Sequence, residues 1–247
     1  MSGLRIGIAG AGAMGHAHAA AYARHGVRIA AIADTDPDRA QTLAAQHDAQ
    51  AVAHVDDLLA AGSNAVSVCL PHHLHASAVL ACVRERVPVL IEKPHCCTAE
   101  EARLIRQTCR EHGQTPMVGF THRFLRSTRE LERRLRAGEL GSIDLVTDCL
   151  AAKSLGPGTP PWFADRQLAG GGITMIGAIH SIDRFRWLLA SEIEAVHAVC
   201  RASRAEDVEH LAVITLEFVC GAVGSLTAYR SPAPGHARRI KLHARPE

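Results

Sequence analysis

A glycine-rich turn between an expected strand and an expected helix is the feature that most constrains this 247-residue chain. An apolar run at residues 4–9 is typical of a buried strand, and residues 13–25 form an alanine-rich helical stretch. In such a unit the first glycine permits a tight turn, the second lets a ligand approach the backbone, and the third lets the helix pack closely on the strand. The turn itself consists of Gly10, Ala11, Gly12, Ala13, Met14 and Gly15.

The turn predicts a binding site for the phosphates of a dinucleotide, because a helix N-terminus offers unpaired N–H groups and a positive dipole end. Asp34 ends the next expected strand, residues 27–33. It stands about 20 residues after the motif, where a carboxylate can accept hydrogen bonds from ribose hydroxyls. A 2′-phosphate would meet Asp34 and Asp36, and we expect no arginine beside them, so the sequence favours NAD over NADP. The expected cofactor contacts in this region are Gly10, Gly12, Ala13, Met14, Gly15 and Asp34.

The pattern of elements predicts an α/β chain of two domains. Residues 1–121 alternate apolar runs with helical stretches, which indicates a Rossmann-type parallel sheet with helices on both faces. Thr98 and Glu101 form an expected capping box at the start of one of these helices. In residues 122–247 a charged helix at residues 124–137 is followed mainly by strand-like runs, which predicts an α+β domain with a mostly antiparallel, open sheet. We assign cofactor binding to the first domain, and substrate binding and oligomerisation to the second.

Composition excludes several classes of partner. The net charge is +2, with 47% hydrophobic and 21% charged residues, which is ordinary for a globular protein and argues against nucleic acid or an anionic membrane as partner. The arginines of residues 123–136 alternate with Glu130 and Glu132, so we interpret this helix as having a solvated charged face. We find neither an apolar run of the roughly 20 residues that span a bilayer nor a signal-peptide pattern, and we expect a cytoplasmic protein.

Three further segments follow the glycine turn along the chain. Residues 70–75, Leu-Pro-His-His-Leu-His, come after an expected strand, and so do residues 92–94, Glu-Lys-Pro. The triple glycine at residues 170–172 precedes a helix expected over residues 173–189. Together with residues 10–15, these segments resemble the Gfo/Idh/MocA family of oxidoreductases, and the resemblance extends along essentially the whole chain.

The resemblance implies hydride transfer between a nicotinamide and a secondary alcohol or ketone of a sugar, inositol or related polyol. It implies that Lys93 contacts the substrate hydroxyl and the nicotinamide ribose, and that His180 acts as the catalytic acid and base. These chemistries fit the residues, because histidine titrates near neutral pH and an ammonium stabilises developing negative charge on oxygen. Further cofactor contacts are expected at Leu70, Pro71, His75, Glu92 and Lys93. Substrate contacts are expected at His122, Trp162 and His180.

The remaining histidines receive less specific interpretations. We reject a metal site at His72, His73 and His75, because relatives place cofactor contacts in this loop. His75 is expected to face the nicotinamide or to cap the next helix. We interpret His16 and His18, in the first helix, as packing or solvent-facing residues.

One position departs from the family pattern. Many dehydrogenases of the family carry an acid four residues before the catalytic histidine, one helical turn away, and here that position is Ile176. Asp183 is expected to brace Arg184 or Arg186. Either His180 and Lys93 suffice for catalysis, or the enzyme belongs to a divergent branch with an altered substrate. The alternative from another class is a non-catalytic NAD-binding sensor or a decayed paralogue.

The C-terminal end raises a separate expectation. Relatives usually continue for several tens of residues beyond the strand that matches residues 239–243. We therefore expect the second domain to be shortened at its C-terminus. A homo-oligomer is expected to form through the second sheet if that sheet is complete.

Overall fold

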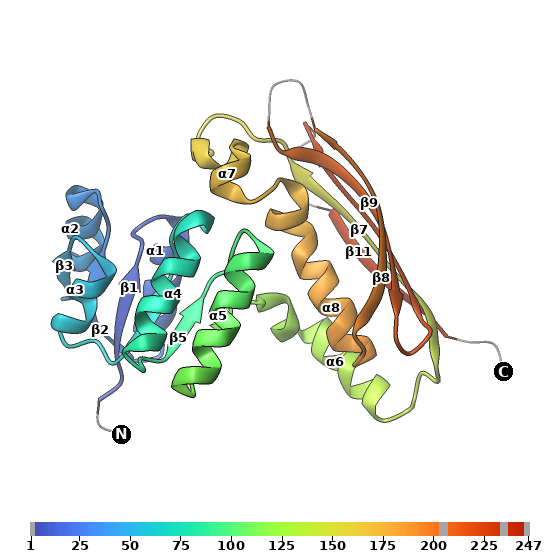
Figure 1. Cartoon of the computed structure of the whole chain (residues 1–247), viewed down its shortest axis with the longest axis horizontal. Coiled ribbons are helices and arrows are strands. Elements are labelled where there is room, and N and C mark those ends of the chain that lie inside the picture. The colour runs from blue at the N-terminus through green and yellow to red at the C-terminus, as the bar shows by residue number, and fades with distance from the viewer. Residues whose placement is uncertain (1–2, 203–206, 233–236, 245–247) are drawn as a thin grey trace. The chain divides into compact units, whose positions relative to one another are not determined.

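The computed structural model describes residues 3–202, 207–232 and 237–244. The chain divides into two compact units, Met1–Gly119 and Phe120–Glu247 (Figure 1). Each unit has its own sheet and its own hydrophobic core.

The first unit is built on a six-stranded sheet in the order β3-β2-β1-β4-β5-β6, with every neighbouring pair parallel. The chain runs outward from β1 through β2 to β3 and then returns to the other side of β1 at β4. Open α/β sheets bind ligands at the carboxyl ends of the strands where the strand order reverses in this way. The strands are β1 (Arg5–Ala9), β2 (Arg28–Ala33), β3 (Gln50–Val52), β4 (Ala65–Val68), β5 (Val89–Ile91) and β6 (Met117–Val118).

Helices cover both faces of this sheet, as the sequence predicts. Ile8 belongs to a buried cluster that contains Ala19 of α1 and Leu43 of α2, whereas Val68 belongs to a second cluster that contains Val79 of α4. Because successive strand residues point to opposite faces, the apolar runs supply both clusters at once. The helices are α1 (Ala13–Arg24), α2 (Pro37–Ala45), α3 (Val55–Ala60), α4 (His75–Arg84) and α5 (Ala99–His112), with a 3₁₀ turn η1 (His72–Leu74) before α4.

Local sequence determines where these helices begin and end. Asp36 caps α2 by accepting hydrogen bonds from the N–H groups of Asp38 and Arg39. The expected capping box of α5 is confirmed, since Thr98 and Glu101 each accept the backbone N–H of the other. The short helix α3 was not predicted, because its six residues are too few to show a helical period.

The second unit contains a five-stranded sheet in the order β11-β7-β10-β9-β8. Its neighbours are antiparallel except for β7 and β10, which run parallel, so the expectation of a mostly antiparallel sheet is confirmed. Gly221, with a φ of +87°, lies in the hairpin between β9 and β10. The strands are β7 (Ile143–Lys153), β8 (Ile193–Ala202), β9 (Glu209–Phe218), β10 (Val223–Ser231) and β11 (Ala237–Ala244).

One face of this second sheet packs against α8 (Figure 1). Phe185 of α8 is fully buried in a cluster with Ile214 and Leu226. The expected helix over residues 173–189 is helical throughout, but its first part is the π-helical turn η4, which precedes α8. The helical segments are η2 (Thr121–Phe124), α6 (Arg126–Arg136), η3 (Pro161–Ala164), α7 (Arg166–Ala169), η4 (Thr174–Ala178) and α8 (Ile179–Leu189).

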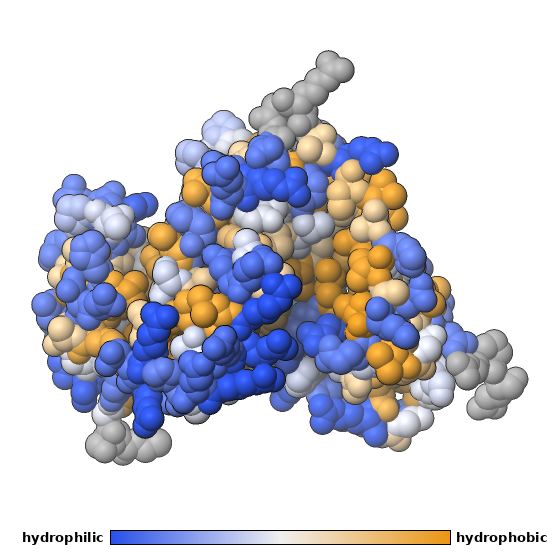
Figure 2. Space-filling model, in the orientation of Figure 1, coloured by the Kyte–Doolittle hydropathy of each residue, from blue (hydrophilic) through white to orange (hydrophobic). Residues whose placement is uncertain are grey.

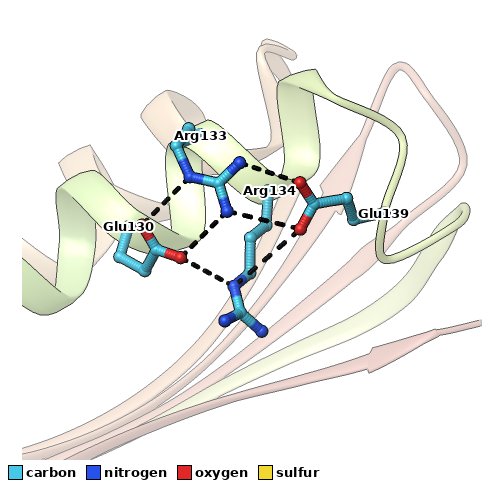
Figure 3. Close-up of polar contacts among 4 residues, drawn as sticks. All are labelled: Glu130, Arg133, Arg134 and Glu139. Carbon is cyan, nitrogen blue, oxygen red and sulfur yellow. Dashed lines mark hydrogen bonds and ion pairs between the residues drawn. The ribbon is translucent and has the colours of Figure 1, made fainter.

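The charged face of α6 is exposed and internally paired. Arg133 bridges Glu130 and Glu139, and Arg134 also pairs with Glu130 (Figure 3). Exposed pairs of this kind contribute little to stability, because water screens them. The interpretation of this arginine-rich helix as a solvated face is consistent with these contacts.

Candidate active site

The first and third glycines of the turn are required by the fold of the unit itself. Gly10 has a φ of +102°, and a Cβ there would lie 2.6 Å from the carbonyl oxygen of Cys69. A Cβ on Gly15 would lie 1.9 Å from the carbonyl oxygen of Gly10. Both distances are below any real contact, so a side chain at either position would force the turn and α1 apart.

Gly12 has no such internal reason, because a Cβ there would meet nothing within 4 Å. It precedes Ala13 at the start of α1, and that helix has neither a side-chain cap nor an acidic residue in its first turn. By contrast, α2 and α5 are each capped by their own side chains. Open space beside uncapped N–H groups is what an incoming phosphate requires, so the turn fits a dinucleotide pyrophosphate. Ala13 and Met14 are exposed at this site.

Asp34 stands at the end of β2, where its carboxylate joins the turn to α2. Its Oδ2 accepts the N–H of Ala11 at 2.9 Å, and its Oδ1 accepts the N–H of Asp36 at 2.9 Å. The guanidinium of Arg39 lies 3.0 Å from Oδ1 and also pairs with Asp36 at 3.1 Å. The expectation that no arginine stands beside these acids is therefore wrong.

Glu92 and His18 form a buried pair behind Lys93. Glu92 is only 6% exposed, and its Oε1 lies 3.1 Å from His18 Nε2. Burial alone would raise the pKa of this carboxyl, but the hydrogen bond and charge of His18, together with Lys93, lower it overall. Glu92 therefore supports Lys93 from inside the unit. His18 is largely buried and, beyond the packing interpretation, its ring also bonds Glu92 and Ser67.

His75 is fully buried and connects two loops at the carboxyl edge of the sheet. Its Nδ1 lies 2.6 Å from the carbonyl oxygen of Pro94, and its Nε2 lies 2.7 Å from that of Leu70. Burial lowers the pKa of His75. With both ring nitrogens directed at backbone carbonyls, the ring connects the two loops on either side of Lys93. Leu70 and Pro71, which begin the loop after β4, are half-buried.

The second unit brings two of the predicted substrate residues together. His180, on α8, is 8% exposed and stacks on His122 of η2, with ring centroids 4.0 Å apart and planes 13° apart. The edge of Phe120 faces the same imidazole at 6.1 Å. Trp162 lies on a different element, η3, where it stacks on Phe163 at 4.0 Å.

The π turn in front of His180 is held by an acid that the sequence did not single out. Glu209 of β9 accepts hydrogen bonds from the N–H of Gly172 at 2.8 Å, from the N–H of Thr174 at 3.0 Å and from the hydroxyl of the same threonine. A Cβ on Gly172 would lie 2.0 Å from the backbone oxygen of Glu209, which explains this glycine. Although burial alone would raise the pKa of Glu209, these bonds lower it overall. π-helical turns occur frequently at functional sites.

Arg123 of η2 binds α8 about one helical turn after His180. Arg123 forms a two-pronged ion pair with Asp183, and its guanidinium lies 4.5 Å from the ring centre of Trp187. The expectation that Asp183 braces Arg184 or Arg186 is therefore wrong. Arg184 instead pairs with the buried Asp148 of β7. The sequence separation of 60 residues between Arg123 and Asp183 gave no local signal of this pairing.

Two further properties concern only the described residues. No group of three or more histidine, cysteine, aspartate or glutamate side chains there has the arrangement of a metal site. Within the same residues, no helix has both the length and the apolar character that crossing a bilayer requires.

The first unit, with its glycine turn and its acid at the end of β2, defines a class of proteins, the oxidoreductases that bind a nicotinamide dinucleotide. Residues 4–120 match a family model described as an oxidoreductase family with an NAD-binding Rossmann fold, and residues 128–245 match the GFO/IDH/MocA C-terminal domain. The chain belongs to the GFO/IDH/MocA family of oxidoreductases, which confirms the resemblance seen in the sequence.

Similar proteins include two inositol dehydrogenases of Saccharopolyspora erythraea. Inositol 2-dehydrogenase 1 is 34% identical over 82% of this chain and 60% of its own length. Inositol 2-dehydrogenase 4 is 30% identical over 96% of this chain and 70% of its own length. A solved structure of levoglucosan dehydrogenase in complex with NADH and levoglucosan superimposes with a TM-score of 0.90 at 25% identity, covering 98% of this chain and 71% of that one. The chain thus spans less than two thirds of the first relative's length.

Proposed function

We propose that this chain is an NAD-dependent dehydrogenase that transfers hydride between the nicotinamide and a secondary alcohol or ketone of a sugar, inositol or related polyol. The observation that carries the proposal is the open space at Gly12, which the packing of the unit does not require and a pyrophosphate would fill. The relatives named as inositol dehydrogenases, and the neighbour with bound NADH and levoglucosan, support the cofactor and the substrate class.

The proposed roles follow from the chemistry of alcohol oxidation. When bound, the nicotinamide supplies the acceptor for the hydride that leaves the alcohol carbon. His180 accepts the hydroxyl proton, and its stacking on His122 fixes the plane of the ring. The ammonium of Lys93 stabilises the negative charge that develops on the substrate oxygen. In the reverse direction His180 returns the proton to the oxygen of the ketone.

The proposal is tested with purified protein and a panel of sugars, inositols and their acids, followed by NADH absorbance. On any active substrate, Lys93→Ala and His180→Ala should each lower turnover by about a hundredfold or more, because general acid–base groups contribute about 10²–10⁴-fold. Lys153→Ala and His197→Ala, which remove exposed side chains of the same types, are the matched controls and should leave turnover unchanged. Wild-type turnover in both site variants, with circular dichroism spectra unchanged, would refute the assignment.

A second candidate function is a non-catalytic NAD-binding sensor, and Ile176 is the observation that favours it. This residue lies in η4, where many relatives carry an acid. Stoichiometric NAD binding by calorimetry, with no NADH formed from any member of the panel, would support the sensor and exclude the dehydrogenase for those substrates.

We infer that the chain assembles with copies of itself through the face of the second sheet opposite α8. Three valines that point to this face are 53% (Val199), 45% (Val213) and 37% (Val223) exposed. Hydrophobic residues are visible among polar ones over this sheet in Figure 2. Val199 and Val213 pair with each other across β8 and β9, and exposed apolar side chains that lie side by side favour an interaction site.

A further inference from the structure

A chain of hydrogen bonds inside the first unit ends at the backbone of Lys93. The hydroxyl of Tyr22 donates to Ser67 Oγ at 3.2 Å, and that oxygen lies 2.7 Å from His18 Nδ1. His18 Nε2 lies 3.1 Å from Glu92 Oε1. The other oxygen of Glu92, Oε2, accepts the N–H of Lys93 at 3.2 Å. This network of hydrogen bonds therefore connects α1, β4 and the segment after β5.

The bonds of this network have a defined direction. Glu92 as a carboxylate only accepts, so His18 Nε2 must carry a hydrogen and donate it. Tyr22 donates to the oxygen of Ser67, and the same oxygen bonds His18 Nδ1. The imidazole is therefore bonded through both ring nitrogens, and a buried network whose members are all satisfied is rigid.

The other titratable groups around the network add no charge near neutral pH. Burial, together with the charge of Glu92, raises the pKa of the Cys69 thiol to about 12. Burial also raises the pKa of Tyr22 and lowers that of His75. Lys93 is therefore the cation that the Glu92 carboxylate meets at this edge of the sheet.

His18 lies on α1, less than one turn after Gly15, in the helix whose N-terminus forms the phosphate cradle. We propose that His18 is a positioning residue that fixes Lys93 relative to this helix by holding the Glu92 carboxylate. The inference rests on the catalytic role assigned to Lys93 in the proposed function. In this arrangement the helix α1 positions both the dinucleotide phosphates, through its N-terminus, and the reacting lysine, through His18 and Glu92.

Two substitutions separate the two bonds of the imidazole. His18→Gln places an amide nitrogen near the position of Nε2 and keeps a donor for Glu92. His18→Asn ends near the position of Nδ1 and reaches Ser67 only.

We expect His18→Asn to lower kcat about tenfold to a hundredfold, the size of effect that a misplaced reacting group causes, with the Kd for NAD changed by less than about threefold. We expect His18→Gln to keep at least about half of kcat, and His25→Asn, at the exposed end of the same helix, to have no effect. Equal losses in the Asn and Gln variants, or none in the Asn variant, would overturn the proposal.

A second readout does not depend on turnover. The chain has only three lysines, Lys93, Lys153 and Lys241, so reductive methylation with ¹³C-formaldehyde gives three assignable lysine signals in NMR spectra. In His18→Asn we expect the Lys93 signal to move and its titration midpoint to fall, because the carboxylate is no longer held near it. The Lys153 and Lys241 signals should not move, and His18→Gln should resemble the wild type.

These signals also separate the two hypotheses. If the wild type turns over no substrate, the proposed function fails, whereas the Lys93 signal still decides the role of His18. If His18→Asn does not fold, as judged by its thermal melt, His18→Ser removes the donor for Glu92 with a small polar side chain and should move the same signal. A Lys93 signal and midpoint identical to those of the wild type, in whichever variant folds, would overturn the inference.

Discussion

At the scale of single residues, we expect Asp34 and Arg39 to decide between the two cofactors, NAD and NADP. Asp34 occupies the position that accepts ribose hydroxyls, and Arg39 is held on its Oδ1 at 3.0 Å. While the pair is intact, a 2′-phosphate would meet a carboxylate, and the guanidinium of Arg39 is engaged by that carboxylate. We therefore propose that a preference for NAD over NADP depends on this ion pair.

We predict that Asp34→Ala will shift the ratio of the NADP and NAD dissociation constants toward NADP by about tenfold or more, since a hydrogen bond to a charged group contributes about 1.5–3 kcal/mol. Isothermal titration calorimetry measures both constants. In the double variant Asp34→Ala/Arg39→Ala the gain should disappear, because the released guanidinium supplies it. Tighter binding of NADP than of NAD by the unaltered chain would show that Asp34 does not read the ribose.

The sequence predicted those residues whose role depends on their place in a local motif. The glycines and Asp34 follow from a strand, a turn and a helix of known lengths. Glu209 and the bond between His18 and Glu92 were missed, because their partners are brought close only by the folded sheet. His18 and Glu92 are 74 residues apart. The positions of these side chains are a tertiary property that no local window contains.

At the scale of elements, the π turn η4 depends on a strand that comes much later in the chain. Glu209 of β9 lies 35 residues after Thr174, yet its carboxylate caps the N–H groups that begin the turn. The sequence predicted helix here correctly, but not its hydrogen-bonding pattern, because that pattern requires a buried acceptor from elsewhere. The strands and the hairpin at Gly221 were predictable, because period and turn chemistry are local.

We predict that Glu209→Gln will lower the free energy of unfolding of the second unit by about 1–3 kcal/mol at neutral pH. All three hydrogen bonds go to Oε1, and a neutral amide oxygen accepts them more weakly than a charged carboxylate oxygen does. Both tryptophans, Trp162 and Trp187, lie in this unit, so the tryptophan fluorescence during urea titration reports its unfolding specifically.

The effect should depend on pH in a definite direction. The pKa of Glu209 is lowered in the folded chain, so its contribution to stability is present above the unfolded value of about 4.3 and is lost as pH falls through the folded value. The gap between wild type and variant should therefore narrow below about pH 4. A gap of constant size from neutral to acid pH would contradict this account.

At the scale of the whole molecule, the face of the second sheet opposite α8 determines the expected assembly. If copies associate through this face, sedimentation velocity will show a species heavier than the monomer, and Val213→Lys will shift the population toward the monomer, because a charge buried in an interface is costly. Val196→Lys is the matched control, since Val196 is also exposed but pairs with Leu216 on the face toward α8. A monomeric wild type, or equal effects of both lysines, would contradict the assignment of the interface.

The parallel pairing of β7 with β10 has a consequence for how the second unit is made. Val223 pairs with Leu145, which lies 78 positions earlier in the chain (223 − 145). During synthesis, β7 therefore leaves the ribosome well before its partner β10. Contacts of such high sequence separation slow folding. The apolar side chains of β7 stay uncovered during that interval. Chaperone dependence and aggregation during expression should accordingly arise from the second unit, while the cofactor-binding unit, complete by Gly119, already has its own core.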